Sequence, residues 1–451
     1  MIYRLLTFIL LVSWAGVQAQ YKIDIKIKGA EQKNVQFGYY YADKQYVLKT
    51  EKADEKGKIV FQGKEKLARG LYLVMLENQM YFDVLVSDDQ EFSIECDTSN
   101  LTQSMKIKGS TENAYFYEFQ QEIINPVQER GKLSVRLYEL PKTSDSVAII
   151  EKRISEINTL TENAWKKYAQ KSGNSFLTNL LTAFNGEPEF AYSNEVFFEH
   201  INFADSGLVR SPALNRVCKL LLARNLNANK PISIMKAEII QLLEKSKANK
   251  EVYAYVFTHF LSFFHSFQRD GINELFVFLH DEYIAKGKTP WFDEKAQAQI
   301  KEEADVFRYS LIGSNAYNIN LESLSGEQIA LNTLEFEHIF VFFWSTGCGH
   351  CEEASKILRD FMVQNKTLDL AIYSVYVKED RKAWADFVSQ YGSNEWFNVW
   401  DPKNESLYKQ HYYISSTPIM YVLDRNKKII NKFSGDAPIK SYLETIVKNE
   451  K

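Results

Sequence analysis

The sequence predicts a multidomain protein with an N-terminal antiparallel β-sandwich, a helical middle domain and a C-terminal α/β domain. Apolar residues alternate along short segments up to about residue 110, and they recur at helical spacing from 111 to 308. Beyond 308, strand-like and helix-like segments alternate. At about 100–200 residues per domain, the chain of 451 residues has room for domains at 20–110, 111–308 and 309–451.

The first domain is predicted from short strands separated by turn-like segments. Ile23, Ile25 and Ile27 alternate with charged residues, a pattern typical of a half-buried strand over 21–29. Because such strands recur at short intervals, they favour a small antiparallel sandwich. Further strands are expected at 35–41, 58–61, 70–76, 81–86 and 91–96.

The middle domain is predicted from apolar residues spaced three or four apart. Ile150, Ile154 and Ile157 illustrate this spacing, with Lys, Glu and Gln on the other faces. Helices are expected at 112–128, 144–170, 175–182, 212–228, 233–247, 251–267 and 273–286.

The C-terminal domain is predicted to have a buried central strand, because Ile339–Trp344 is a continuous apolar run. The segments 316–320 and 328–332 flank Leu324-Ser325-Gly326-Glu327 as an expected hairpin. Further strands are expected at 370–377, 419–423 and 429–433, and helices at 351–364, 382–391 and 439–447.

Residues 1–19 predict a secretory signal peptide. Arg4 precedes an apolar stretch at 5–12, and small residues follow, ending in Val17-Gln18-Ala19. The stretch is shorter than the about 20 residues that span a membrane. We therefore expect an exported chain, in the periplasm or cell envelope, with no stable membrane span after cleavage. An uncleaved membrane anchor is the alternative.

Net charge and cysteine content narrow the classes of function that the chain can have. The net charge is −4, with both signs mixed along the chain, so no basic surface for nucleic acid is indicated. Four cysteines are too few for a disulfide framework, and two of them lie three apart. Cys96 and Cys218 are interpreted as buried small hydrophobes, with a pairing between two domains as the alternative.

Cys348-Gly349-His350-Cys351 lies at a predicted strand-to-helix junction. At a helix N-terminus, unpaired N–H groups and the helix dipole favour a thiolate, which is the attacking species. The second cysteine, one turn along, can attack the resulting mixed disulfide and release the product. A structural disulfide and half of a zinc site are the alternatives, but zinc normally takes four ligands and no second Cys pair exists. No metal or organic cofactor is expected.

At these residues the chain resembles the thioredoxin superfamily. The stretch 342–351 resembles its active-site strand and loop, and Ser416-Thr417-Pro418 resembles its cis-proline loop. The resemblance covers about residues 311–451. Within the superfamily, this part of the chain is most similar to the exported TlpA/ResA-like branch. It implies a thioredoxin fold, Cys348 as the nucleophile and Cys351 as the resolving thiol. It also implies a cis Pro418 that places Thr417 backbone groups beside the substrate chain.

Other site residues are expected around the two cysteines. His350 would favour the thiolate and make the disulfide a better oxidant, or would simply be a solvated residue. Many thioredoxins have a buried Asp where this chain has Phe342, so Glu352 is the candidate proton acceptor. A favourable acid in the first helical turn is its alternative role. Trp344 is expected to contact substrate beside the active site, with plain core packing as the alternative.

The predicted function is therefore an exported thiol-disulfide oxidoreductase acting on protein substrates and reset by an unidentified redox partner. A thiol peroxidase would have Thr three residues before its reactive Cys and Pro further upstream. Here Ser345 occupies that spacing and no such Pro precedes it. The other alternative is an envelope binding or scaffold protein with a regulatory or vestigial CxxC, because most of the chain lies outside the redox module.

Overall fold

The computed structural model describes residues 19–184, 201–228, 230–267, 271–392, 394–414 and 416–449. All of the predicted signal peptide except Ala19 lies outside these residues. The described part divides into two compact units, one ending at His259 and one beginning at Phe260. None of the helices in the described ranges combines the length and apolar character needed to cross a bilayer.

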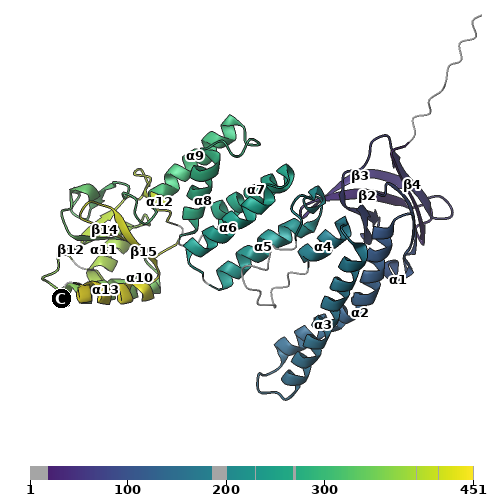
Figure 1. Ribbon diagram of the computed structural model, residues 1–451. Helices are drawn as coiled ribbons and strands as arrows, with labels where there is room; N and C mark the ends of the chain where they lie inside the picture. Colours follow the sequence, from purple (N-terminus) through teal and green to yellow (C-terminus); the bar gives the residue numbers. More distant parts are fainter. Residues whose placement is uncertain are drawn as a thin grey trace, which may run out of the picture. The chain divides into compact units, whose positions relative to one another are not determined.

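Eight strands form the N-terminal sandwich (Figure 1). One sheet has the order β4-β1-β7-β8 and the other β3-β2-β5-β6. The two sheets meet through the stacked rings of Phe37 and Phe61, whose centroids lie 5.1 Å apart. The strands are β1 Tyr21–Lys28, β2 Asn34–Tyr41, β3 Lys44–Lys52, β4 Lys58–Gly63, β5 Gly70–Leu76, β6 Tyr81–Val86, β7 Glu91–Asp97 and β8 Lys106–Lys108, with the short helix α1 Leu101–Ser104 before β8.

The sandwich differs from the prediction in one pairing, because β1 and β7 run parallel while the other neighbouring strands run antiparallel. The predicted antiparallel sandwich is therefore confirmed in all of its pairings except this one. Strand β3 was not predicted, since nearly all of its residues are exposed and its sequence has no apolar alternation.

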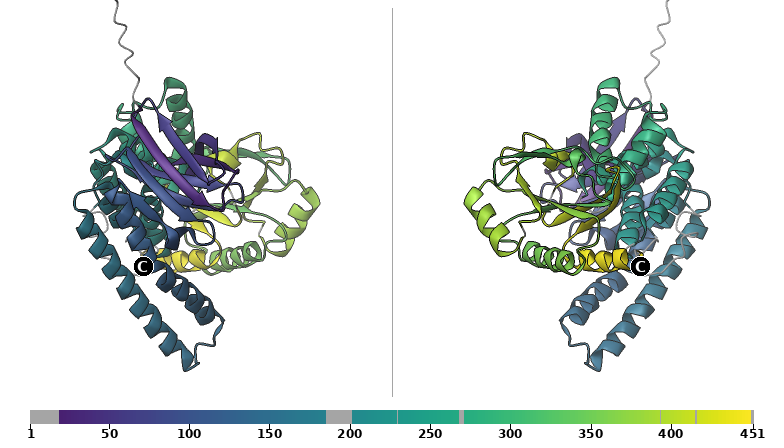
Figure 2. Two further views of the ribbon diagram at one scale, coloured as in Figure 1. Left: turned by 90° about the vertical axis from the view of Figure 1, so that its right-hand side faces the viewer. Right: turned by 90° about the vertical axis from the view of Figure 1, so that its left-hand side faces the viewer.

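Helices make up the middle of the chain, as predicted. Helices α2 and α3 are long and lie side by side as a hairpin (Figure 1, Figure 2). Helix α2 contains Pro126 and ends at Glu139, eleven residues beyond the predicted end at 128. The elements are α2 Thr111–Glu139, α3 Ser146–Ser172, α4 Phe176–Phe184, η1 Ser206–Leu208, α5 Pro212–Asn227, α6 Ile232–Ser246, α7 Lys250–Ser266, α8 Ile272–Leu279, η2 His280–Ile284 and α9 Glu294–Arg308.

The C-terminal sheet has seven strands in the order β10-β9-β13-β12-β11-β14-β15. Its central strand β11 is buried on both faces, in agreement with the continuous apolar run. The strands are β9 Asn320–Ser323, β10 Gln328–Ala330, β11 His338–Trp344, β12 Leu370–Tyr376, β13 Phe397–Trp400, β14 Ile419–Asp424 and β15 Ile429–Ser434. The helical elements are η3 Leu331–Thr333, α10 Gly349–Gln364, α11 Arg381–Gln390, α12 Tyr408–His411 and α13 Ala437–Asn449.

This sheet and its helices form the expected thioredoxin-like fold, with parallel β11, β12 and β13 and antiparallel β14 and β15. The predicted hairpin is present, but its first strand begins at Asn320 rather than 316. Asn315 instead forms a bridge to Lys428, and Ala316 donates its N–H to the Lys427 carbonyl, so this segment is held at the β14–β15 turn.

Candidate active site

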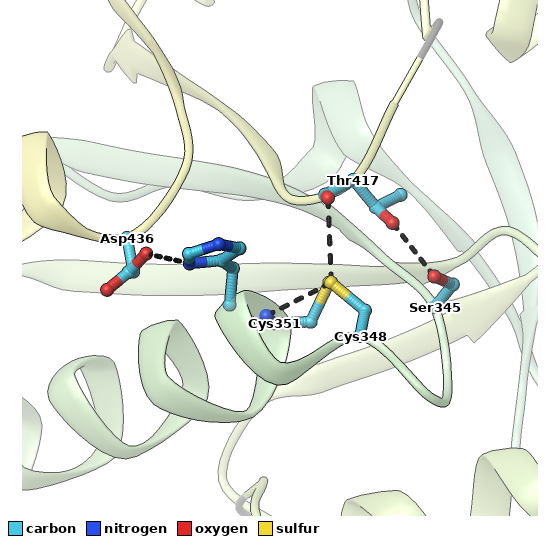
Figure 3. Close-up of a disulfide and its surroundings, with 6 residues drawn as sticks. Ser345, Cys348, Cys351, Thr417 and Asp436 are labelled. Carbon is cyan, nitrogen blue, oxygen red and sulfur yellow. Dashed lines mark hydrogen bonds and ion pairs between the residues drawn. A yellow bond between two sulfur atoms is a disulfide. The ribbon is translucent and has the colours of Figure 1, made fainter. Parts of the chain in front are cut away.

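Cys348 and Cys351 form a disulfide at the N-terminus of α10, with their Cα atoms 5.2 Å apart. Cys348 is the N-cap residue, and the Cys351 N–H lies 3.2 Å from its sulfur (Figure 3). Gly347 has φ of 72°, a left-handed conformation that favours glycine and turns the chain from β11 into the helix. Cys348 is half-buried, whereas Cys351 is 0% exposed. The Cys348 sulfur is therefore more accessible to another molecule than the Cys351 sulfur is.

The loop before β14 lies against the Cys348 sulfur. The Thr417–Pro418 peptide bond is cis, as the resemblance implies. The Thr417 carbonyl oxygen lies 3.5 Å from the Cys348 sulfur, and the Thr417 hydroxyl bonds to the Ser345 hydroxyl at 2.8 Å (Figure 3). These groups meet because β11 and β14 pair up to Phe343 and Ile419, so the residues just beyond both strands become neighbours. Ser345 is a positioning residue that the sequence did not single out for this role.

His350 points toward a carboxylate on the adjoining loop. Its Nδ1 lies 2.7 Å from Asp436, the residue before α13, and its side chain is 78% exposed (Figure 3). A ring nitrogen facing a carboxylate carries the proton, which leaves Nε2 to face solvent or substrate. Sequence reasoning missed Asp436, because it lies 86 residues from His350 and belongs to no motif.

Trp344 lies in the core, with 1% of its surface exposed. Its indole N–H donates to the Ser374 hydroxyl at 2.8 Å, and its ring stacks on Phe387 with centroids 3.9 Å apart. A side chain this buried offers little surface to a substrate, so the structure favours the alternative of core packing. Trp344 therefore supports the strand that leads to Cys348.

Phe342 occupies the strand position at which many thioredoxins have a buried Asp, and its side chain is fully buried. Glu352 lies in the first turn of α10 and faces Tyr391, which caps the C-terminus of α11. Burial, and then the hydrogen bond to the Glu352 carboxylate, raise the pKa of the Tyr391 hydroxyl. Glu352 therefore has a partner on the neighbouring helix, and it also meets the positive end of the α10 dipole.

The other two cysteines are free thiols buried in the N-terminal unit. Burial raises the pKa of Cys96 to about 12 and raises that of Cys218 further. The interpretation as buried hydrophobes therefore holds, and the two residues are not paired. Within the described ranges, no group of three or more His, Cys, Asp or Glu side chains could hold a metal ion.

Comparisons with known proteins agree with this geometry. Residues 337–429 match a thioredoxin-like family model, and residues 21–116 match a domain described as of unknown function. The thiol-disulfide oxidoreductase ResA of Bacillus subtilis is 27% identical over 141 residues, which are 31% of this chain and 77% of ResA.

Solved structures give similar matches. A thioredoxin-like protein from Bacteroides caccae matches with TM-score 0.42 and 21% identity, covering 59% of this chain and 92% of its own. A domain of a possible thiol-disulfide isomerase from Cytophaga hutchinsonii matches with TM-score 0.28 and 30% identity. This match covers 31% of the present chain and 95% of that domain. The family model therefore shows a thioredoxin-like domain at residues 337–429, and the C-terminal part of the chain is similar to the thiol-disulfide oxidoreductase ResA.

Proposed function

We propose that this chain is exported and exchanges disulfides with protein substrates through Cys348 and Cys351. The observation that carries the proposal is the contrast between a reachable sulfur at the helix N-cap and a buried one a turn later. The first can attack a large substrate, and only a group within the chain can reach the second. The proposed parts are a sandwich at 20–110, a helical domain at 111–308 and the redox domain at 309–451.

In the proposed reaction, the Cys348 thiolate attacks one sulfur of a substrate disulfide. The substrate S–S bond breaks, a mixed disulfide forms, and one substrate thiolate leaves. Cys351 then loses its proton and attacks the Cys348 sulfur, which releases the second substrate thiolate. The substrate gains two electrons and the chain is left with the disulfide seen here. The reverse sequence oxidises a dithiol, and a redox partner resets the pair in either direction.

The surrounding residues have distinct proposed roles. The Thr417 carbonyl beside the Cys348 sulfur supports the idea that backbone groups before Pro418 hold an extended substrate chain. His350 would stabilise the Cys348 thiolate. Glu352 is retained as the proton acceptor for Cys351, although its contact with Tyr391 supports a structural role as well.

Trapping of the mixed disulfide tests the exchange. The full-length Cys351→Ser variant, mixed with oxidised insulin, should accumulate a covalent adduct that dithiothreitol releases. The matched Cys348→Ser variant should give none. If neither variant forms an adduct and the wild-type chain does not reduce insulin, the exchange activity is refuted and the scaffold alternative takes its place. Export is tested separately, by whether residues 1–30 direct a fused reporter enzyme out of the cytoplasm.

A further inference from the structure

The N-terminal sandwich contains a pocket of about 700 Å³ whose walls are rich in tyrosine. This volume lies within the range of about 300–1,000 Å³ that is usual for ligand sites. Tyr39 and Tyr72 pack against each other there with ring centroids 6.5 Å apart, and Tyr41 and Leu48 at the wall are exposed. The aromatic and apolar lining comes from β1, β2, β3 and β5, and comprises Tyr21, Tyr39, Tyr41, Leu48 and Tyr72.

Two glycines give the pocket its shape. A Cβ at Gly63 would lie 2.4 Å from the Tyr21 ring, so only glycine lets that ring lie along the wall. A Cβ at Gly70 would lie 2.5 Å from the Cβ of Arg210, whose carbonyl accepts the Leu71 N–H at 2.8 Å. Arg210 is thereby held at the pocket by the backbone of β5. These close approaches fix the wall at Tyr21 and Arg210, whereas residues 64–68 line the pocket as a loop.

The pocket is basic. Its charged residues are Lys49, Lys64, Lys66 and Arg210 against Glu65 alone. Arg210 is paired with Glu251 at 2.6 Å, and Lys49 donates to the Gln62 carbonyl. Lys64 and Lys66 are exposed and have no acidic partner within the described ranges. An uncompensated pair of ammonium groups beside aromatic walls favours an occupant that is both anionic and apolar.

The pocket adjoins a free strand edge. Strand β3, which contributes Leu48 and Lys49 to the wall, is the outer strand of its sheet. Eight of its nine residues are exposed, and β3 pairs with β2 alone, although β4 lies close to part of it and Lys49 reaches the Gln62 carbonyl there. Such an edge pairs with an extended peptide through main-chain hydrogen bonds, while adjacent pockets select side chains. This feature favours a peptide over a free anion.

We propose that this pocket binds an extended segment of a protein partner in which acidic and aromatic residues alternate. The acidic side chains meet Lys64 and Lys66, and an aromatic side chain enters the tyrosine-lined cavity. The inference rests on the proposed function in one respect, since it makes the sandwich the part of the chain that captures the protein substrate. Binding itself needs no cysteine, so it can be measured apart from disulfide exchange.

The test uses the full-length protein and a fluorescein-labelled peptide with three Glu-Phe repeats and no cysteine, followed by fluorescence anisotropy. A Lys-Phe peptide of the same length is the comparison ligand. The acidic peptide should bind, and binding should weaken as salt is added. In the Lys64→Glu/Lys66→Glu variant, affinity should fall on the order of tenfold, because two attractive charges become repulsive.

The matched control is Lys106→Glu/Lys108→Glu in β8, which reverses two exposed lysines at the same spacing in the same domain and should leave affinity unchanged. Leu48→Ser should weaken binding several-fold without changing the charge. Equal affinity for the Lys-Phe peptide, an equal loss in the control variant, or full displacement by millimolar inorganic phosphate would overturn the proposal. The Cys348→Ser/Cys351→Ser variant keeps the two questions apart: it cannot exchange disulfides, but it should bind the acidic peptide as tightly as the wild type, and a loss of binding in it would overturn the proposal.

Discussion

Asp83 in β6 makes the stability of the N-terminal sandwich depend on pH. Its side chain is half-buried, and its carboxylate accepts a hydrogen bond from the Tyr40 hydroxyl at 2.9 Å. The Tyr117 hydroxyl, on α2, covers the same residue by donating to its backbone carbonyl at 2.6 Å. Burial raises the pKa of the Asp83 carboxyl from 3.8 to about 6, and the Tyr40 bond opposes this only in part. The group therefore prefers to be neutral in the folded protein.

The sign and size of the effect follow from this pKa. Because the folded state binds the proton more tightly than the unfolded state, stability is greatest below about pH 4 and falls as pH rises through about 6. At 1.36 kcal/mol per unit of pKa, the charged carboxylate costs about 3 kcal/mol above pH 7. An asparagine keeps the acceptor for Tyr40 and has no charge to bury. Asp83→Asn should therefore stabilise the sandwich by about 3 kcal/mol at pH 8 but by only about 1 kcal/mol at pH 4.5, where the carboxyl is neutral in the folded state and mostly charged in the unfolded state.

Urea titrations of the full chain at the two pH values, with hydrogen exchange of β5 and β6 as the readout, measure this difference. That readout reports on the strands of the sandwich themselves rather than on the chain as a whole. The matched control is Asp88→Asn, the same substitution at a fully exposed side chain, and it should show no such pH dependence. Equal shifts for Asp83→Asn at both pH values would refute the reasoning, because the carboxyl would then have the same charge in both states.

Three further results are expected. His350→Ala should lower the reduction potential of the Cys348–Cys351 pair by about 30 mV, measured against glutathione, because the group that favours the thiolate is lost. An unchanged potential would leave His350 as a solvated residue. Trp344→Phe removes the donor to Ser374 and should destabilise the C-terminal domain by about 1–3 kcal/mol in thermal unfolding. An unchanged unfolding temperature would mean that this bond contributes little. Cys96 and Cys218 should not react with Ellman's reagent in the folded oxidised protein and should both react in urea, because burial raises the pKa of each thiol. Rapid labelling of either in the folded state would contradict that burial.

The elements that could be predicted are those whose own residues carry the pattern. Strand β1 shows three alternating isoleucines and β11 a continuous apolar run, and both are buried as expected. Strand β3 has no such pattern, since pairing with β2 rather than burial holds it. Helix α2 passes Pro126 because proline removes only one N–H donor, and Glu129, beyond it, is tied to Arg153 of α3 at 2.7 Å. The parallel pairing of β1 with β7 depends on chain topology, which no local pattern records.

The residues of the site also fall into two groups: those that a short sequence motif marks and those that only the folded chain brings together. Cys348, Cys351 and Pro418 are visible in short motifs, because each motif defines its own local backbone. Ser345 and Asp436 acquire their contacts only when β14 and α13 fold back beside the N-terminus of α10. A serine after a strand and an aspartate before a helix are common, so nothing in the sequence marks these two. What could not be predicted is therefore the part of the site formed by tertiary contacts.

The burial of Cys351 bears on how its proton leaves. Its sulfur lies in a core cluster with Phe342 and Trp344, and the strand position that holds a carboxylate in many relatives holds Phe342 here. A proton cannot pass into this apolar face without a large desolvation cost. It must leave instead toward the open end of α10, where Cys348 and a bound substrate lie. There the thiolate released in the first step is a second proposed acceptor beside Glu352, which lies in the first turn of α10. When this thiolate takes the proton, departure of the substrate and activation of Cys351 become one coupled event. Resolution should then depend on the pKa of the leaving thiol as well as on its fit to the site.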